Sequence, residues 1–211
     1  MIPSLRSTEP VPATLRKKNL LWLGLSAEAA LFRQPLVIFA TLLGPRPDAD
    51  AAMHTMRFDL KFVNALALAL PALLLVARLS RPDAKPGLLA AFLFAPLVLL
   101  AGAVIVELIV VPSDQWMSRL IGQNMRYCTT AIPLMAAPIL AALIFALRAG
   151  APRYPGWTGA LAGAASAGLA AFLYASHCPD DSPLFVATWY PLATGVCAAA
   201  GAWAGRRWLV W

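Results

Sequence analysis

The chain has 211 residues, of which 60% are hydrophobic and only 13% are charged, and its formal net charge is +7. The apolar residues come in long blocks instead of alternating or recurring on one helical face, which excludes an ordinary soluble domain. Because a helix needs about 20 predominantly apolar residues to cross a bilayer, we expect an all-α integral membrane protein with six transmembrane helices in an up-down bundle. The expected spans are 20–43, 58–77, 88–111, 126–147, 156–176 and 182–205.

Residues 1–19 form a short tail ahead of the first span. The tail contains several prolines and a basic run, Arg16-Lys17-Lys18. Proline at this density argues against a helix. We therefore expect a disordered, positively charged cytoplasmic anchor, and a second short cytoplasmic end at 206–211.

The first span, 20–43, is the least regular because it contains Glu28, Arg33 and Pro35. A charged side chain at mid-bilayer costs roughly 2.5 to 3.5 kcal/mol. Glu28 and Arg33 are five residues apart and do not face each other on a helix. Two interpretations stay open: a polar site inside the bundle, or a helix whose charges meet partners on neighbouring helices or water.

The second span, 58–77, carries Asp59 and Lys61 close to its start. Both are compatible with a transmembrane helix if they lie at its wet end, where a lysine can extend its ammonium group to the headgroups. The third span, 88–111, continues past Glu107.

Basic residues are distributed unequally between the two sides of the bundle. The side of both termini carries most of them, whereas the other side has only Arg46, Arg57, Lys61, Arg119 and Arg126. Because cytoplasmic loops are enriched in Lys and Arg, both termini are expected in the cytoplasm. Topology explains the positive charge, so it indicates no nucleic-acid site.

The loop between the fifth and sixth spans, SHCPDDSP at 176–183, is rich in reactive and titratable side chains. Pro183 fits the first turn of a helix, and Ser182 or Asp181 fits the N-cap. Asp180 and Asp181 would lie at the positive end of the sixth helix dipole. Helix capping thus accounts for most of the loop, but not for His177 and Cys178.

Two of the three cysteines are expected at the same membrane surface. Cys197 lies deep in the last span, where a small buried apolar role fits. Cys128 begins the fourth span and Cys178 follows the fifth, and a disulfide would require Cα atoms within about 7 Å. Three interpretations are open: a redox-sensitive pair, a soft-metal site of both thiolates with the imidazole of His177, or a structural disulfide or two unrelated thiols.

The C-terminal third, LYASHCPDDSPLFVATWYPLATGVCAAAGAWAGRRWLVW, closely resembles the end of the NrsF family (negative regulator of sigma F), six-span bacterial anti-sigma factors. MRYCTTAIPLMAAPILAALIFALRAGAP and RPDADAAMHTMRFDLKFVNALALALPALLLVARLSRP fit the same pattern. The resemblance covers about residues 44–211 and is most specific in HCPDDSPLFVATWY.

The resemblance implies a function. Members hold an extracytoplasmic-function sigma factor inactive at the inner membrane until a stress such as heavy-metal exposure acts on a cysteine pair, and Cys128 and Cys178 match that pair. It implies a cytoplasmic sigma-factor partner, no direct nucleic-acid binding, no catalytic residue, and no cofactor other than a regulatory soft metal at the pair. Oxidation or ligation would then shift the packing of the fourth to sixth helices.

The tail departs from the family pattern, because members commonly begin with an amphipathic, partly acidic segment suited to holding the sigma factor. With the basic tail 1–19, two alternatives are open: the sigma factor binds the inner loops, or the protein has diverged from that role.

A small transporter or channel is the alternative, because prolines inside the spans could break helices around a central site. Against transport, the last three spans have no ionisable group near mid-membrane, and no inverted repeat is visible. A thiol oxidoreductase would require a Cys-x-x-Cys motif, and no hydrolase or nucleotide motif is present. We therefore expect no enzymatic activity.

Overall fold

A computed structural model describes residues 33–210. The described part is helical throughout and contains no strand. An apolar helix, Arg33–Leu43, ends in the π-helical turn η1 (Phe39–Leu43). The other elements are α2 (Ala49–Ala52), α3 (Met56–Leu79), η2 (Gly87–Phe94), α4 (Ala95–Val110), η3 (Ser113–Gln115), α5 (Trp116–Ile121), α6 (Met125–Leu147), α7 (Pro155–Ala175) and α8 (Pro183–Trp208).

Five helical stretches are long and apolar enough to cross a membrane: Met56–Leu79, Gly87–Val110, Ser113–Leu147, Pro155–Ala175 and Pro183–Trp208. They confirm the all-α class and five of the six expected membrane-length helices. Of the expected span 20–43, the described residues include only Arg33–Leu43, which is shorter than a span. Glu28 and the tail 1–19 lie outside the described residues, and Arg33 is exposed.

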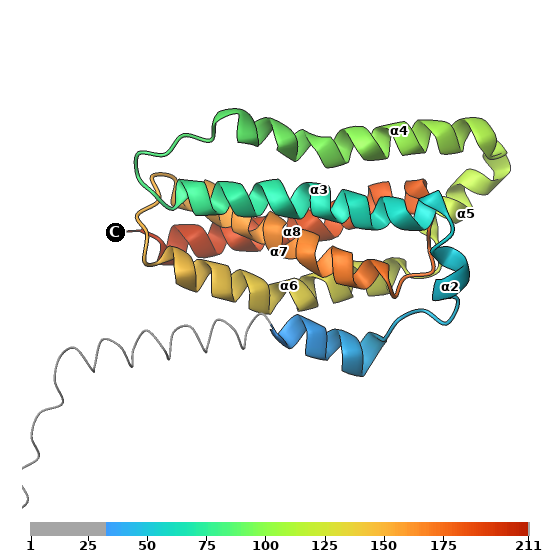
Figure 1. The fold of residues 1–211 in the computed structure, drawn as a ribbon, viewed down its shortest axis with the longest axis horizontal. Coiled ribbons are helices and arrows are strands. Elements are labelled where there is room, and N and C mark those ends of the chain that lie inside the picture. The colour runs from blue at the N-terminus through green and yellow to red at the C-terminus, as the bar shows by residue number, and fades with distance from the viewer. Residues whose placement is uncertain (1–32, 211) are drawn as a thin grey trace, which may run out of the picture.

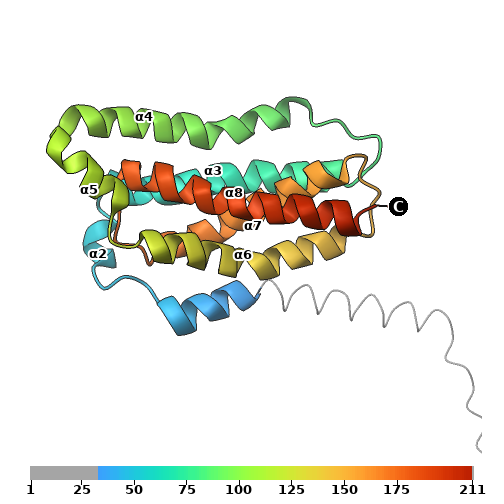
Figure 2. The same cartoon turned by 180° about the vertical axis from the view of Figure 1, so that it is seen from behind.

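The helix α7 lies at the centre of the bundle and packs against α8, α3 and α6. Helix α4 is the outermost element on one side, and Arg33–Leu43 is the outermost on the other (Figures 1 and 2). The α4 face is largely exposed, as expected for a helix whose surface contacts lipid.

Small residues explain how closely α7 approaches its neighbours. A Cβ atom added to Gly159 would meet the backbone of Gly201 on α8, and one added to Gly163 would meet the backbone of Cys197. On another face of α7, a Cβ atom at Gly168 would lie 2.9 Å from the Cβ of Ala69 on α3. Glycine therefore permits backbone contact along α7, as small residues do in membrane bundles.

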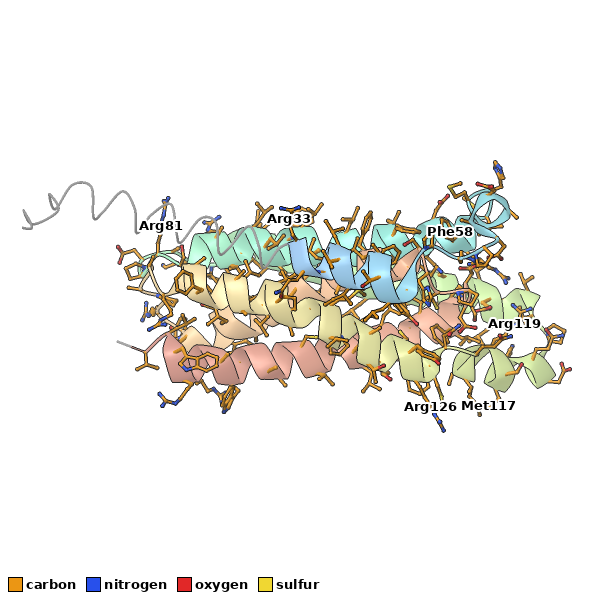
Figure 3. All side chains as sticks on the ribbon, turned by 90° about the horizontal axis from the view of Figure 1, so that it is seen from below. Arg33, Phe58, Arg81, Met117, Arg119 and Arg126 are labelled. Atoms are coloured by element: carbon orange, nitrogen blue, oxygen red, sulfur yellow. The ribbon has the colours of Figure 1, made fainter. Side chains whose placement is uncertain are left out.

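The loops gather at two opposite ends of the bundle. One end, here called the loop end, carries α2, α5 and the connection 176–182 between α7 and α8, whereas the C-terminus lies at the other (Figure 1). Figure 3 places Arg81 at the C-terminal end and Arg119 and Arg126 at the loop end. At the C-terminal end, the N–H of Ala151 donates to the carbonyl of Ser80 at 3.1 Å, which joins two of the loops.

Candidate functional site

The structure places Cys128 and Cys178 in one buried cluster at the loop end. Cys128 lies in the first turns of α6 and Cys178 in the α7–α8 connection; each is fully buried and a free thiol. The same cluster contains Tyr174, Tyr190 and, further along α8, Cys197, which is buried as expected. The two tyrosine hydroxyls have no hydrogen-bond partner among the described residues. The thiols are therefore shielded from water together.

The backbone around Cys178 is held firmly. Its carbonyl accepts a hydrogen bond from the Lys61 ammonium at 2.7 Å and one from Arg46 Nη1 at 3.3 Å. Its N–H donates to the carbonyl of Tyr174 at 3.0 Å, at the end of α7. Burial raises the pKa of the Cys178 thiol to about 11, although the positive charge of Lys61 opposes the shift. The thiol is protonated at neutral pH.

Asp181 joins two cations that come from different parts of the chain. Its carboxylate lies 2.6 Å from Lys61 Nζ of α3 and 2.8 Å from Arg46 Nη1. Arg46 also forms a bidentate pair with Asp48 at 2.6 Å, and this hydrogen bonding lowers the pKa of Asp48 to about 2. Phe58 stacks beneath both cations, 5.3 Å from Lys61 Nζ and 5.9 Å from the Arg46 guanidinium carbon. Two cations and two carboxylates form a neutral cluster.

The position of Lys61 differs from the sequence expectation. Its side chain is 0% exposed, whereas Asp59, two residues earlier, is exposed as predicted. Lys61 is able to remain buried because the carboxylate of Asp181 and the carbonyl of Cys178 satisfy its ammonium group inside the protein. Snorkelling was therefore the wrong interpretation for Lys61, and this residue belongs to the site.

The acidic loop is built differently from a simple helix cap. Ser182 directly precedes α8 and Pro183 is its first residue, as predicted, but Ser182 makes no capping hydrogen bond to its own helix. Asp180 instead accepts hydrogen bonds from the N–H groups of Gln123 at 3.1 Å and Asn124 at 2.8 Å, just ahead of α6. The loop thus folds toward α6, and Asp180 holds the start of the cysteine-bearing helix.

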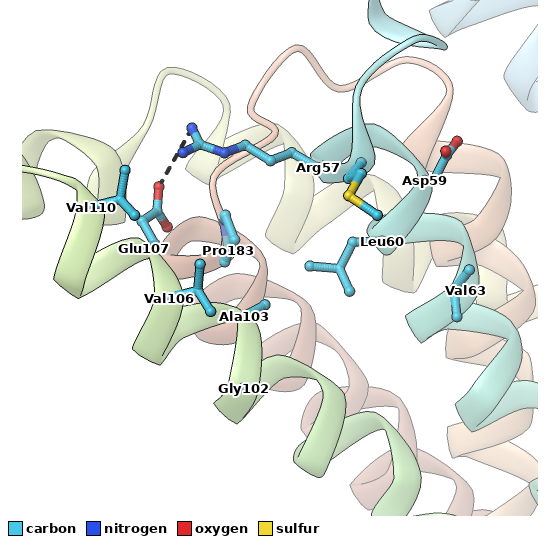
Figure 4. A pocket seen from close by; sticks show the side chains of 11 residues that line it. Arg57, Asp59, Leu60, Val63, Gly102, Ala103, Val106, Glu107, Val110 and Pro183 are labelled. Carbon is cyan, nitrogen blue, oxygen red and sulfur yellow. Dashed lines mark ion pairs between the residues drawn. The ribbon is translucent and has the colours of Figure 1, made fainter.

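The cap of α8 comes from α4. Glu107 is 2% exposed. Its carboxylate accepts hydrogen bonds from the hydroxyl of Ser182 and the N–H of Leu184, both at 2.9 Å. Arg119 lies 3.3 Å from this carboxylate. Arg57 lies 3.9 Å from it (Figure 4). A side chain more than seventy residues away in sequence thus performs the role assigned to the loop carboxylates.

His177 is not gathered with the two thiols. Its Nδ1 lies 2.9 Å from the carbonyl of Gly44, which ties the loop to the segment after helix Arg33–Leu43. Among the described residues, no group of three or more His, Cys, Asp or Glu side chains is placed to hold a metal ion. The imidazole of His177 is therefore not placed together with both thiols to hold a metal ion.

A lateral groove separates α3 from α4 near the loop end. It has a volume of about 570 Å³ and ends at the Arg57–Glu107 pair (Figure 4). Its walls are mostly apolar and include Leu60, Val63, Gly102, Ala103 and Val106. A groove of this kind, open between two helices, suits lipid chains better than the polar pathway that an ion or solute would need.

Comparisons with known proteins agree with the sequence resemblance. A family model described as NrsF, negative regulator of sigma F, matches residues 6–211. The anti-sigma-F factor NrsF of Caulobacter vibrioides (strain NA1000 / CB15N) is 34% identical over 210 residues, 98% of this chain and 93% of that protein. The chain belongs to the NrsF family. The probable anti-sigma-F factor NrsF of Azospira oryzae (strain ATCC BAA-33 / DSM 13638 / PS) is 29% identical over 175 residues, 83% of this chain and 82% of that protein.

Membership of the NrsF family confirms two expectations: the protein is a regulator and not an enzyme, and its partner is a sigma factor. The match begins at residue 6, so it includes the tail and the first apolar segment, which the sequence resemblance at 44–211 does not cover. Family membership favours regulation over a transporter or channel. No solved structure matches the chain.

Sequence reasoning missed Arg46, Lys61 and Glu107 as parts of the site. Arg46 was counted only as a basic residue of one membrane side, Lys61 was placed at the wet end of its span, and Glu107 was noted only as a charge within the third span. A signal was present nonetheless, because an ionisable residue within an apolar span is by default functional and requires a partner. What the sequence could not supply was the identity of each partner, since those partners lie on distant segments.

Proposed function

We propose that this NrsF-family protein is a bacterial inner-membrane anti-sigma factor that holds an extracytoplasmic-function sigma factor inactive and releases it when Cys128 and Cys178 are oxidised or bind a soft metal. The observation that carries the proposal is the burial of both thiols in one cluster at the loop end. The loop with Cys178 and the start of α6 with Cys128 are further joined by the Asp180 hydrogen bonds.

The distribution of charge supports the orientation. The end with the C-terminus carries basic residues that include Arg78, Arg81, Arg148, Arg206 and Arg207. A cytoplasmic location of this end follows the positive-inside rule. The loop end then faces the periplasm, an oxidising compartment in which a thiol pair can form a disulfide.

Two chemical events would change the pair. An external disulfide R–S–S–R can accept two electrons, so that Cys128 and Cys178 become a disulfide and two R–SH molecules are released. Alternatively, a soft divalent cation binds both thiolates and displaces two protons. Both routes draw the α6 start and the α7–α8 loop together, and both require the buried thiols to become accessible for a moment.

The partner surface is proposed at the cytoplasmic loops. The tail is basic and contains prolines, whereas the family pattern has an acidic amphipathic segment there. The loops after α3 and α6 are joined by the Ala151–Ser80 hydrogen bond and carry Arg81 and Arg153. This pair of loops offers a fixed basic surface to an acidic part of the sigma factor.

Thiol state in intact cells tests the sensor role. Cells that express the Cys197→Ala protein are treated with cadmium or an oxidant, quenched in acid, denatured and alkylated, and each thiol is quantified by mass spectrometry. A sigma-dependent reporter is read in parallel. We expect Cys128 and Cys178 to lose reactivity together as the reporter rises, and Cys178→Ser to abolish the response. A normal response in Cys178→Ser cells would refute the sensor role.

A further inference from the structure

Residues 44–48, here called the strap, connect helix Arg33–Leu43 to α2 and make polar contacts to the bundle chiefly through the Cys178 loop. The Arg46 N–H donates to the carbonyl of Ser176 at 3.0 Å. The Arg46 guanidinium donates to the carbonyl of Cys178 and to Asp181. His177 Nδ1 meets the carbonyl of Gly44 at 2.9 Å. The strap is therefore fixed by four residues of the very loop that carries one of the two thiols.

The helix that the strap holds lies at the edge of the bundle, and Pro35 is its one buried residue. Helix Arg33–Leu43 lies outside the bundle (Figures 1 and 2) and has mostly exposed side chains. Its inner face, formed by Ile38, Phe39 and Leu43, packs in part against the buried cluster that contains both thiols. Among the described residues, its hydrogen bonds are local, such as that from Thr41 Oγ1 to the carbonyl of Val37. A change in the thiol cluster therefore reaches this helix by two routes, one apolar and one polar.

The core helices are poorly suited to move in response. Backbone meets backbone between α7 and α8 at Gly159 and Gly201, and again at Gly163 and Cys197. Interiors packed this closely respond to a local change as a rigid unit. A displacement at Cys178 is therefore taken up more readily by an element with few buried contacts, because such elements have the lowest local stability.

We propose that the strap 44–48 transmits the state of the cysteine pair to helix Arg33–Leu43. The inference rests on the proposed sensor function of the pair. When Cys178 moves toward Cys128, its carbonyl leaves Lys61 and Arg46. Arg46 then follows the loop or releases it, because its buried guanidinium requires those acceptors.

Hydrogen exchange with mass spectrometry tests this inference on the full chain in lipid nanodiscs. The Cys197→Ala protein is compared in its reduced state and after diamide or cadmium treatment, and the same samples report the mass of each thiol. We expect backbone exchange of 33–48 to rise at least fivefold after treatment, with exchange of α7 and α8 unchanged. Exchange changes confined to α6, α7 and α8, with 33–48 unaltered, would overturn the inference although the sensor function survives. Thiols that never react would overturn the sensor function itself.

An uncoupling variant sharpens the test. Arg46→Met removes the side-chain contacts to Cys178, Asp181 and Asp48 but leaves Asp181 paired with Lys61. We expect 33–48 to exchange in the reduced variant as fast as in the oxidised parent, with no further rise on oxidation and with both thiols still reactive. Arg126→Met is the matched control, because Arg126 is an exposed arginine of the loop end without an ion pair among the described residues.

If exchange of 33–48 in the Arg46→Met protein rose on oxidation as it does in the parent, the proposed role of the strap would be refuted. If that variant fails to fold, Arg46→Lys, which retains the charge but loses the bidentate geometry, replaces it and is expected to respond at an intermediate level. The comparison of reduced and oxidised parent protein decides the question without any variant.

Discussion

Asp181→Asn is expected to destabilise the protein more than any other substitution of a single carboxylate at the loop end. The change removes the counter-ion of Lys61, which is 0% exposed and lies 2.6 Å away, and one of the two carboxylates of Arg46. Breaking a buried ion pair from one side costs about 3 to 5 kcal/mol. The Asp181 side chain is 21% exposed, and in the variant Lys61 retains its hydrogen bond to the carbonyl of Cys178. The expected loss is therefore at the lower end, about 3 kcal/mol.

The matched control is Asp48→Asn. It is the same chemical change on the other carboxylate of Arg46, but the Asp48 side chain is 59% exposed, so water replaces much of what is lost. Its effect on the free energy of unfolding is expected to be a small fraction of the Asp181→Asn effect. The assay is unfolding in mixed micelles by SDS titration, followed by tryptophan fluorescence. Trp189 is a suitable reporter because its indole N–H bonds to the carbonyl of Leu120 at the loop end.

A double-mutant cycle separates charge from packing. With Lys61→Met added to Asp181→Asn, no unpaired ammonium remains at this position. The double variant is expected to lose less free energy of unfolding than the two single variants lose in sum, with a coupling energy of about 1 to 3 kcal/mol. Equal losses for Asp181→Asn and Asp48→Asn, or strict additivity in the cycle, would refute the argument that a buried ion cluster holds the loop.

Three further outcomes can be measured. Glu107→Gln should lower the free energy of unfolding by about 1 to 2 kcal/mol, because it removes the charged cap of α8. The loss should be visible as faster amide exchange at 184–186. Asp114→Asn, at an exposed carboxylate, should change neither. Gly163→Ala should lower the free energy of unfolding by about 1 to 3 kcal/mol, because the added Cβ forces α7 away from Cys197. Gly195→Ala should not destabilise the protein, because the added Cβ meets open space. Equal effects of the two substitutions would contradict the close packing. Burial raises the pKa of Cys178 to about 11, so the native state retains a proton that the unfolded state loses near about pH 8.5. The free energy of unfolding should therefore fall by up to about 1.4 kcal/mol per pH unit between about pH 8.5 and 11. A Cys178→Ser protein should lack that component of the slope.

The cysteine cluster illustrates how far sequence reasoning reached. Cys128 and Cys178 were expected at one surface because helix lengths and the alternation of direction along the chain put them there. The structure brings them into one buried core. His177 was a reasonable third ligand by its place in the sequence, but folding directs it to Gly44. Neighbours along a loop can point to opposite sides, so adjacency in sequence does not define a ligand set.

The sequence by itself determined the all-α class, five of the six expected membrane-length helices and the family. These properties follow from the length of the apolar blocks and from a short, distinctive motif, both of which are local. Only the tertiary structure decided that Lys61 is buried on Asp181, that Asp180 holds the start of α6, and that Glu107 caps α8. Each of these contacts joins residues more than fifty positions apart. Which charge meets which depends on how the helices rotate and pack, and the glycines of α7 set that packing through backbone contacts.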